Sequence, residues 1–164
     1  MTRPEQVIWA AGFIDGEGFV GISRGTSRNG RPCHQPMVDV TQARQRAPLD
    51  LLVGLFGGRV RLQKTSCGPA FNWRVTTEQA RLVLLAVLPY LVVKRPQADL
   101  LLQYSETLWV RGGKFRHVPE DVMAQREAIY QQLRRLNARR SPLHAERLSE
   151  STPSLTLVRP AVNG

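Results

Sequence analysis

The stretch AAGFIDGEG at residues 10–18 decides the fold, and it lies between the helical run PEQVIW and the alternating run FVGISR. It places three glycines and two acids within nine positions at the end of an apolar helix. A glycine inside a helix costs about 1 kcal/mol relative to alanine, so a helix that keeps Gly12 and Gly16 usually needs close approach to a second helix. Followed by Asp15 and Glu17, these small residues predict a seam that brings carboxylates to a shared centre.

Length and charge limit the class of protein. A chain of 164 residues is about one domain. The formal net charge of +10 and the pI of about 10.9 point to a polyanionic partner. No signal-peptide pattern or apolar run of ~18 residues is present, so we expect an intracellular protein, cytoplasmic or organellar, without a membrane partner. Cys33 and Cys67 lack metal-ligand spacing, and we expect no disulfide in a reducing cell.

Hydrophobic periodicity predicts helices and strands over most of the chain. We expect four strands that pair as two hairpins, over residues 18–24, 35–42, 58–64 and 70–76. Helices are expected over residues 4–15, 47–56, 77–88, 96–110 and 119–138. The predicted fold class is α+β, in the order α-β-β-α-β-β-α. One face of a four-stranded antiparallel sheet packs on helices, and the other stays open and polar.

The chain reads as one domain over residues 1–140, followed by an irregular tail over residues 141–164 that is rich in Ser, Thr and Pro. The stretch at residues 10–18 occurs once. A seam built from it therefore needs a second chain, which predicts a homodimer.

The stretch at residues 10–18 resembles the signature of the LAGLIDADG homing endonucleases. The positions that match the nine-letter motif as written are Ala11, Gly12, Ile14, Asp15 and Gly18. The other letters are replaced by Ala10, Phe13, Gly16 and Glu17. Two more segments resemble the family: VDVTQARQR at 38–46 is similar to a strand end with active-site polar groups, and PYLVVKRPQADLLLQ at 89–103 to a segment with an active-site lysine before a helix. The resemblance covers roughly residues 4–138.

The resemblance implies a metal-dependent active site at the end of the first helix. The family's acid at the eighth motif position binds metal, and Glu17 holds that position, with the carbonyl of Gly16 as a second candidate ligand. The implied ion is Mg²⁺, which Mn²⁺ or Ca²⁺ can replace for binding. Further catalytic candidates, by their places in the two similar segments, are Gln42, Arg46 and Lys94. The plain alternatives are a solvated helix-end acid and ordinary surface polar residues.

The first helix is also expected to form the dimer interface. The residues that the resemblance places there are Ala11, Gly12 and Asp15, and Asp15 is expected to make a structural hydrogen bond at the helix end rather than to bind metal.

Period-two alternation collects polar and basic side chains on the open sheet face. Arg can pair bidentately with guanine, and Gln or Asn with adenine, in a major groove that admits a two-stranded ribbon. The expected DNA-binding residues are Ser23, Arg24, Arg28, Arg31, Gln35, Asp39, Arg59, Arg61, Gln63, Lys64, Asn72 and Arg74. For any one arginine, the alternative is a solvated surface charge.

The function that the resemblance implies is site-specific cleavage of double-stranded DNA during intron homing. A symmetric dimer implies a pseudo-palindromic target, and the family implies roughly twenty base pairs and 3′ overhangs. Three alternatives stay open: an RNA-binding intron maturase of the same fold, a non-catalytic DNA-binding regulator, and a basic structural protein associated with RNA or ribosomes. Only the maturase alternative would make RNA a partner of this fold.

Overall fold

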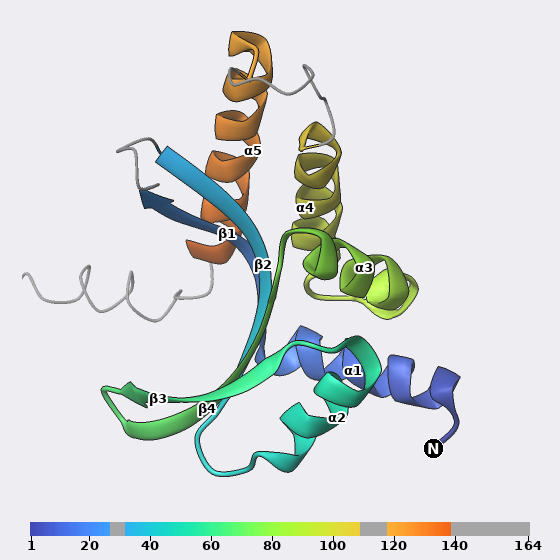
Figure 1. The fold of residues 1–164 in the computed structure, drawn as a ribbon. Coiled ribbons are helices and arrows are strands. Elements are labelled where there is room, and N and C mark those ends of the chain that lie inside the picture. The colour runs from blue at the N-terminus through green and yellow to red at the C-terminus, as the bar shows by residue number, and fades with distance from the viewer. Residues whose placement is uncertain (27–31, 109–117, 139–164) are drawn as a thin grey trace, which may run out of the picture.

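The computed structural model describes residues 1–26, 32–108 and 118–138 (Figure 1). Two predicted DNA-binding residues, Arg28 and Arg31, and the predicted tail at 141–164 lie outside the described residues.

The described residues form an α+β fold, which confirms the predicted class. The helices are α1 (Arg3–Glu17), α2 (Ala47–Phe56), α3 (Thr77–Val87), the 3-10 helix η1 (Leu88–Tyr90), α4 (Arg95–Thr107) and α5 (Glu120–Ala138). The strands are β1 (Gly18–Thr26), β2 (Pro32–Gln42), β3 (Arg59–Thr65) and β4 (Gly68–Thr76). None of the described helices is long and apolar enough to cross a membrane.

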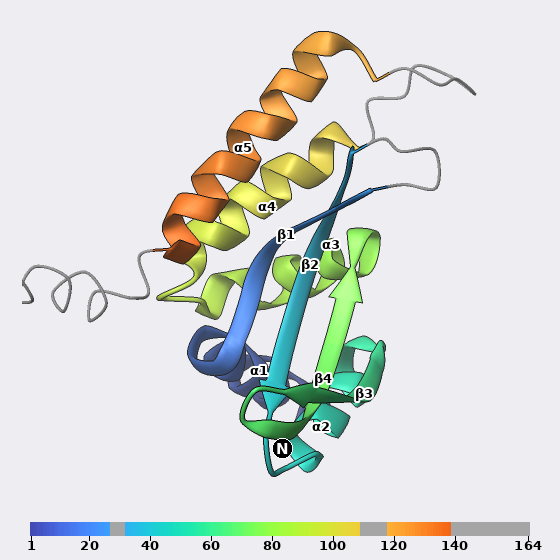
Figure 2. The ribbon, with the colours of Figure 1, turned by 90° about the vertical axis from the view of Figure 1, so that its left-hand side faces the viewer.

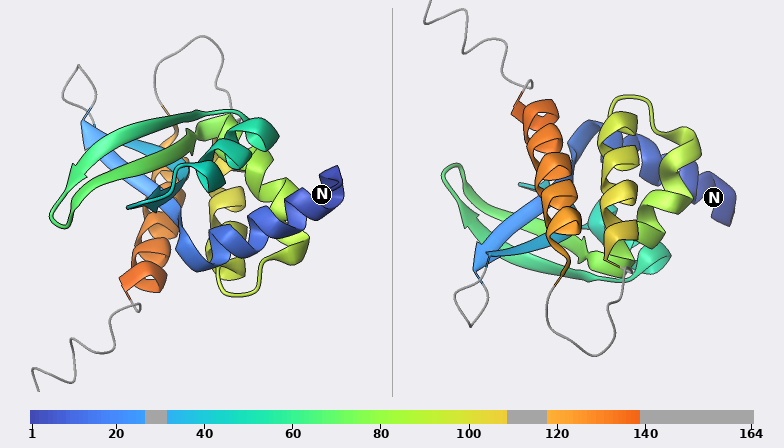
Figure 3. Two further views of the ribbon diagram at one scale, coloured as in Figure 1. Left: turned by 90° about the horizontal axis from the view of Figure 1, so that it is seen from below. Right: turned by 90° about the horizontal axis from the view of Figure 1, so that it is seen from above.

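The four strands form one antiparallel sheet in the order β1-β2-β4-β3. The two predicted hairpins are therefore joined side by side through β2 and β4, where Asp39 pairs with Arg74 and Thr41 with Asn72. On the outer strands, Phe19 of β1 pairs with Asp39, and Arg59 of β3 pairs with Arg74. The sheet is strongly curved, and the helices gather on one side of it (Figures 2 and 3).

The core lies between the sheet and the helices. Val38, Val40, Trp73 and Val75 alternate with the polar residues of β2 and β4 and are at most 1% exposed. The indole N–H of Trp73 donates to the carbonyl of Gly57 over 2.9 Å, so the largest buried side chain keeps its polar atom satisfied. This packing positions the polar side of both strands outward.

Helix α1 has one side in the core and one side exposed. Ala10, Ala11 and Ile14 have no exposed surface. The exposed side carries Ile8, Gly12 and Gly16, four residues apart, and nothing lies within 4 Å of a Cβ built on either glycine. The expectation that Ala11 lies at the dimer interface is therefore wrong, because Ala11 packs inside its own chain.

Candidate functional site

The C-terminal end of α1 is held against the start of α4 by the side chain of Asp15. Its carboxylate accepts backbone N–H bonds from Val92 over 2.6 Å, from Val93 over 3.1 Å and from Lys94 over 2.8 Å. Partial burial raises the pKa of Asp15, but the three N–H bonds and the charge of Lys94 outweigh it and hold the pKa below the ordinary value of 3.8. Asp15 thus has the hydrogen-bonding role at the helix end that the sequence predicts.

Lys94 completes the same junction. Its side chain is 2% exposed, and its ammonium group donates a hydrogen bond to the backbone carbonyl of Asp15. That carbonyl is one of the last in α1 and has no partner within the helix, so a lysine there also complements the negative end of the helix dipole. The structure therefore brings Lys94 to the end of α1, where its bonding partner Asp15 lies two residues before Glu17.

Glu17 and Gly16 lie on the surface beside this junction. Both are exposed. Gly18, the next residue, pairs with Val40, so the antiparallel register brings the end of β2 beside the end of α1. Gln42, the half-buried last residue of β2, therefore approaches the same place. Among the four catalytic candidates, Glu17, Gln42 and Lys94 share one end of the sheet.

Arg46 forms an ion pair at the start of α2. It precedes α2, is exposed, and its Nε donates to Oδ1 of Asp50 one helical turn later over 3.1 Å. An exposed pair of this kind contributes little stability, on the order of 0.3–0.5 kcal/mol. The assignment of Arg46 to the catalytic group stays a prediction.

The residues at the end of α1 fit a divalent ion only as part of a larger ligand set. Within the described ranges, no three His, Cys, Asp or Glu side chains lie together as a metal site. One chain supplies the exposed carboxylate of Glu17 and the helix-end carbonyl of Gly16, which are the hard oxygen ligands that Mg²⁺ prefers. Because Mg²⁺ usually takes one or two carboxylates plus phosphate oxygens, this donor set fits an ion shared with a nucleic acid.

The side of the sheet away from the helices, which we call the open face, carries polar residues of all four strands. The predicted members that the alternation places there are Ser23, Gln35, Asp39, Arg59, Arg61, Gln63, Asn72 and Arg74. A hollow of about 670 Å³ on this face is lined by residues of β2, β3 and β4 and the start of α3, among them Gln35, Arg59, Arg61, Gln63, Asn72 and Arg74.

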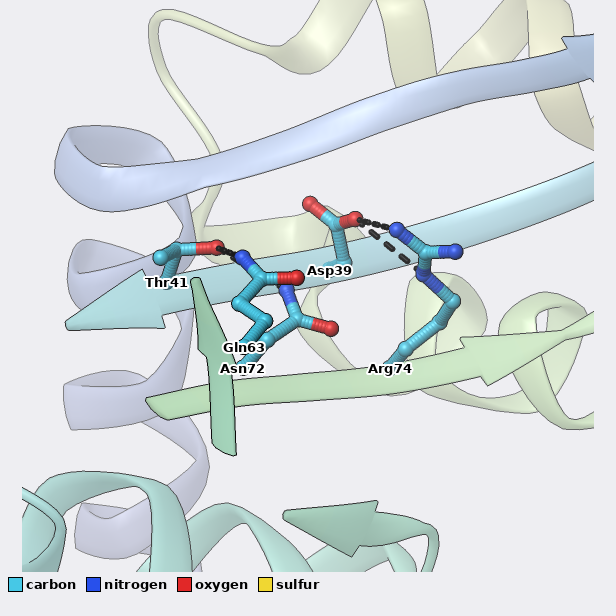
Figure 4. A network of polar contacts seen from close by, with 5 residues as sticks. All are labelled: Asp39, Thr41, Gln63, Asn72 and Arg74. Atoms are coloured by element: carbon cyan, nitrogen blue, oxygen red, sulfur yellow. Dashed lines mark hydrogen bonds and ion pairs between the residues drawn. The ribbon is translucent and has the colours of Figure 1, made fainter. Parts of the chain in front are cut away.

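Two hydrogen-bonded groups organise the open face (Figure 4). In the first, Arg74 donates from Nε and Nη2 to the same carboxylate oxygen of Asp39, over 3.2 and 2.8 Å. In the second, the side-chain amides of Asn72 and Gln63 donate to the hydroxyl of Thr41 over 2.9 and 3.5 Å. Thr41 was missed by the sequence reasoning, although it follows Asp39 at a spacing of two and so shares its face.

Two predicted DNA-binding residues lie on the wrong side of the sheet. The guanidinium of Arg24 stands over the ring of Tyr130 in α5, 5.9 Å from its centre. Its partner in the register is His34, whose ring lies 5.1 Å from the same Tyr130 ring. Alternation also puts Lys64, near the β3–β4 turn, on the other face of the sheet from Gln63. The prediction that Arg24 and Lys64 belong to the open face was wrong, because side chains alternate strictly along a strand.

The fold itself matches known structures. No protein-family model matches the chain, and no curated protein matches it. I-Vdi141I, an archaeal intron-encoded homing endonuclease complexed with DNA, gives a TM-score of 0.65 at 18% identity, over 80% of this chain and 84% of that one. The LAGLIDADG homing endonuclease I-GzeII, in complex with its DNA target, gives 0.64 at 18% identity. The chain has the fold of the LAGLIDADG homing endonucleases.

Two of the matched structures differ in how much of them this chain covers. The homing endonuclease I-CvuI, solved with its target and Ca²⁺, matches with a TM-score of 0.58 at 22% identity, and the match covers 77% of this chain and 96% of I-CvuI. In I-GzeII, 98% of this chain matches only 53% of the other protein. The chain thus corresponds to nearly all of a short LAGLIDADG-fold protein and to about half of a long one.

Proposed function

We propose that this protein is a site-specific, double-strand DNA endonuclease that acts as a homodimer and depends on a divalent metal ion. One observation carries the proposal: α1 ends in an exposed carboxylate, Glu17, at one end of a basic sheet face, and the buried Lys94 is bonded to the carbonyl of Asp15 two residues earlier. The matched proteins I-Vdi141I and I-GzeII are homing endonucleases in complex with DNA, which supports the same use of the fold here.

The exposed side of α1 supports the dimer. Gly12 and Gly16 leave the helix backbone accessible, and Ile8 adds an apolar contact that is 49% exposed. Two copies packed through this side, in two-fold symmetry, would bring their two Glu17 side chains together. The match to nearly all of I-CvuI and to about half of I-GzeII agrees with a chain that forms half of the working unit.

The open face supports DNA as the partner. Arginines of β3 and β4 face outward with amides beside them, and a β-ribbon of this kind fits a major groove of about 12 Å. A two-fold dimer would then read a pseudo-palindromic target of roughly twenty base pairs and leave 3′ overhangs in an intron-homing reaction.

Each group at the end of α1 has a separate task in this proposal. Glu17 and the carbonyl of Gly16 would hold the ion, which supplies charge stabilisation at the scissile phosphate when bound. Lys94 would stay on the Asp15 carbonyl and hold the helix end in place, and its positive charge would stabilise negative charge that develops on the phosphate. Gln42 would contribute a hydrogen-bonding amide from the end of β2.

The test is cleavage of a duplex that spans the insertion site of the protein's own gene, with the intron removed, in Mg²⁺ and in EDTA. We expect cutting at one position in Mg²⁺ only. Glu17→Gln should abolish cutting and keep site-specific binding, whereas Glu120→Gln, an exposed acid in the first turn of α5, should cut like the wild type. Undiminished cutting by Glu17→Gln would exclude the metal assignment.

The same experiment separates the alternatives. Tight binding to the duplex without cleavage in Mg²⁺ would favour a DNA-binding regulator. Binding to the intron transcript and not to the duplex would favour an RNA maturase.

A further inference from the structure

Asp39 is an acidic residue on a surface that is proposed to bind DNA, where basic and neutral polar residues are expected. It is the only acidic residue in the four strands, and it lies near the centre of the open face. A carboxylate there is repelled by phosphate groups and lowers affinity for any nucleic acid. Its side chain is only 14% exposed, so it has little surface of its own to present to a base. Its presence needs a reason other than direct contact.

The contacts of Asp39 supply that reason. Arg74 lies on the neighbouring strand directly opposite Asp39 and is 48% exposed. Its Nε and Nη2 both donate to Oδ2 of Asp39, which fixes the guanidinium plane, and the third nitrogen points away from the carboxylate (Figure 4). The outer edge of the guanidinium, formed by Nη1 and the second N–H of Nη2, therefore remains available as a pair of parallel donors.

We propose that Asp39 is a positioning residue that orients Arg74 to read one guanine in each half-site of the DNA target. Guanine presents O6 and N7 as two acceptors in the major groove, and a fixed arginine edge pairs with both. Orienting the side chain before binding lowers the conformational entropy lost on contact. Pairing with guanine therefore gains more binding free energy than pairing with any other base. The proposal rests on the proposed DNA-binding function of the open face.

The neighbouring arginines provide the contrast. Arg59 pairs with Arg74 on the other side, and Arg61 lies two residues further along β3. Both are exposed, and neither has an ion-pair partner among the residues that the structure describes. Such side chains keep their freedom and serve phosphates and bases alike. The carboxylate thus distinguishes Arg74 from two arginines of the same face.

The experiment is selection of bound sequences from a randomised duplex pool with Ca²⁺ in place of Mg²⁺, followed by sequencing, for the full chain and its variants. The wild type should select a two-fold site with a guanine preferred at least about tenfold at one position per half-site. Arg74→Ala should lose that preference. Asp39→Asn should reduce it several-fold at the same position while it tightens binding to random DNA, because a negative charge is gone.

Arg59→Ala is the matched control, since it removes an arginine of the same row without a carboxylate beside it. It should keep the guanine preference that Arg74 sets. Asp39→Asn added to Arg74→Ala should change the selected sequence no further, as expected of a residue that acts through Arg74.

Three results would overturn the proposal. In the first, Asp39→Asn tightens all binding equally and leaves the guanine preference intact, which would make Asp39 only a repulsive charge. In the second, Asp39→Asn alters a cytosine preference at another position, which would make it a direct reader. In the third, its effect persists in the absence of Arg74. If the wild type selects no sequence at all, it is the proposed function that fails, and thermal unfolding of each variant identifies any that do not fold.

Discussion

Removing the carboxylate of Asp15 should both destabilise the fold and misplace the candidate site. The carboxylate accepts three N–H bonds at the start of α4, and each such bond contributes about 1 kcal/mol net. Val92 is 81% exposed and Val93 61% exposed, so water can replace part of what Asp15→Ala removes at these two groups. We therefore expect Asp15→Ala to lower the free energy of unfolding by about 2–3 kcal/mol.

The assays are urea unfolding and thermal unfolding, both followed by circular dichroism. For a chain of this size, 2–3 kcal/mol should lower the melting temperature by roughly 4–12 °C. Asp99→Asn is the control, because Asp99 is a half-exposed acid on α4 whose ion pair with Arg95 spans 3.6 Å. It should cost no more than about 0.5 kcal/mol. A loss below about 0.5 kcal/mol for Asp15→Ala would refute the argument that these bonds hold α1 to α4.

The same carboxylate predicts a dependence on pH. Its pKa in the folded chain lies below the ordinary value of 3.8, so the folded state binds the proton more weakly than the unfolded state. The stability from the ionised form is fully present above the unfolded pKa and is lost as the pH falls through the folded pKa. The difference in unfolding free energy between wild type and Asp15→Asn should therefore be constant near neutral pH and shrink below about pH 4.

Three further substitutions test the two sides of the end of α1 and the buried face of the β1–β2 hairpin. Gly12→Ala should stabilise the monomer by about 0.5–1 kcal/mol, because nothing lies within 4 Å of the new Cβ, and it should weaken the dimer in analytical ultracentrifugation. Gly18→Ala is the control: its Cβ would meet the Ile14 carbonyl at 2.7 Å, so it should destabilise the monomer instead. Burial, assisted by the charges of Arg24 and Arg126 and opposed by that of Glu127, holds the pKa of His34 below 6.5. Acidification from pH 7.5 to 5.5 should therefore destabilise the wild type more than His34→Leu in urea unfolding. An equal loss in both proteins would show that His34 stays out of the transition.

The sheet was readable from the sequence because period-two alternation is a property of the strand itself. Asp39 on β2 and Asn72 and Arg74 on β4 share a face whatever the strand packs against, so their common face could be predicted, and the same rule places Thr41, which was missed. The error at Arg24 came from grouping it with Ser23 on the open face, although adjacent residues of a strand point to opposite faces. Its neighbour Ser23 already fixed the alternation, and following it would have put Arg24 on the helix side.

Other features depend on contacts that no local pattern contains. The bond from Lys94 to the Asp15 carbonyl joins residues 79 apart in the chain, and its burial follows from how α4 docks on α1. The pairing of β2 with β4 is also non-local, because the local sequence pattern of each hairpin predicts only the pairing of its own two strands. The burial of Ala11 in its own chain could not be predicted for a related reason. A small residue fits a close contact with the chain's own core as well as a close contact with a second chain.

The two acids of α1 show why spacing alone does not assign a role. Successive residues of a helix are rotated by roughly 100°, so Asp15 and Glu17 point about 200° apart. One faces the start of α4 and accepts its N–H groups, and the other faces outward at the surface. The fold therefore uses the carboxylate of Asp15 to fix the helix end, whereas that of Glu17 is exposed and, in the proposed function, holds the metal ion. Substitution should separate the two roles: Asp15→Asn should change stability and its pH dependence, whereas Glu17→Gln should leave both unchanged and remove only cleavage.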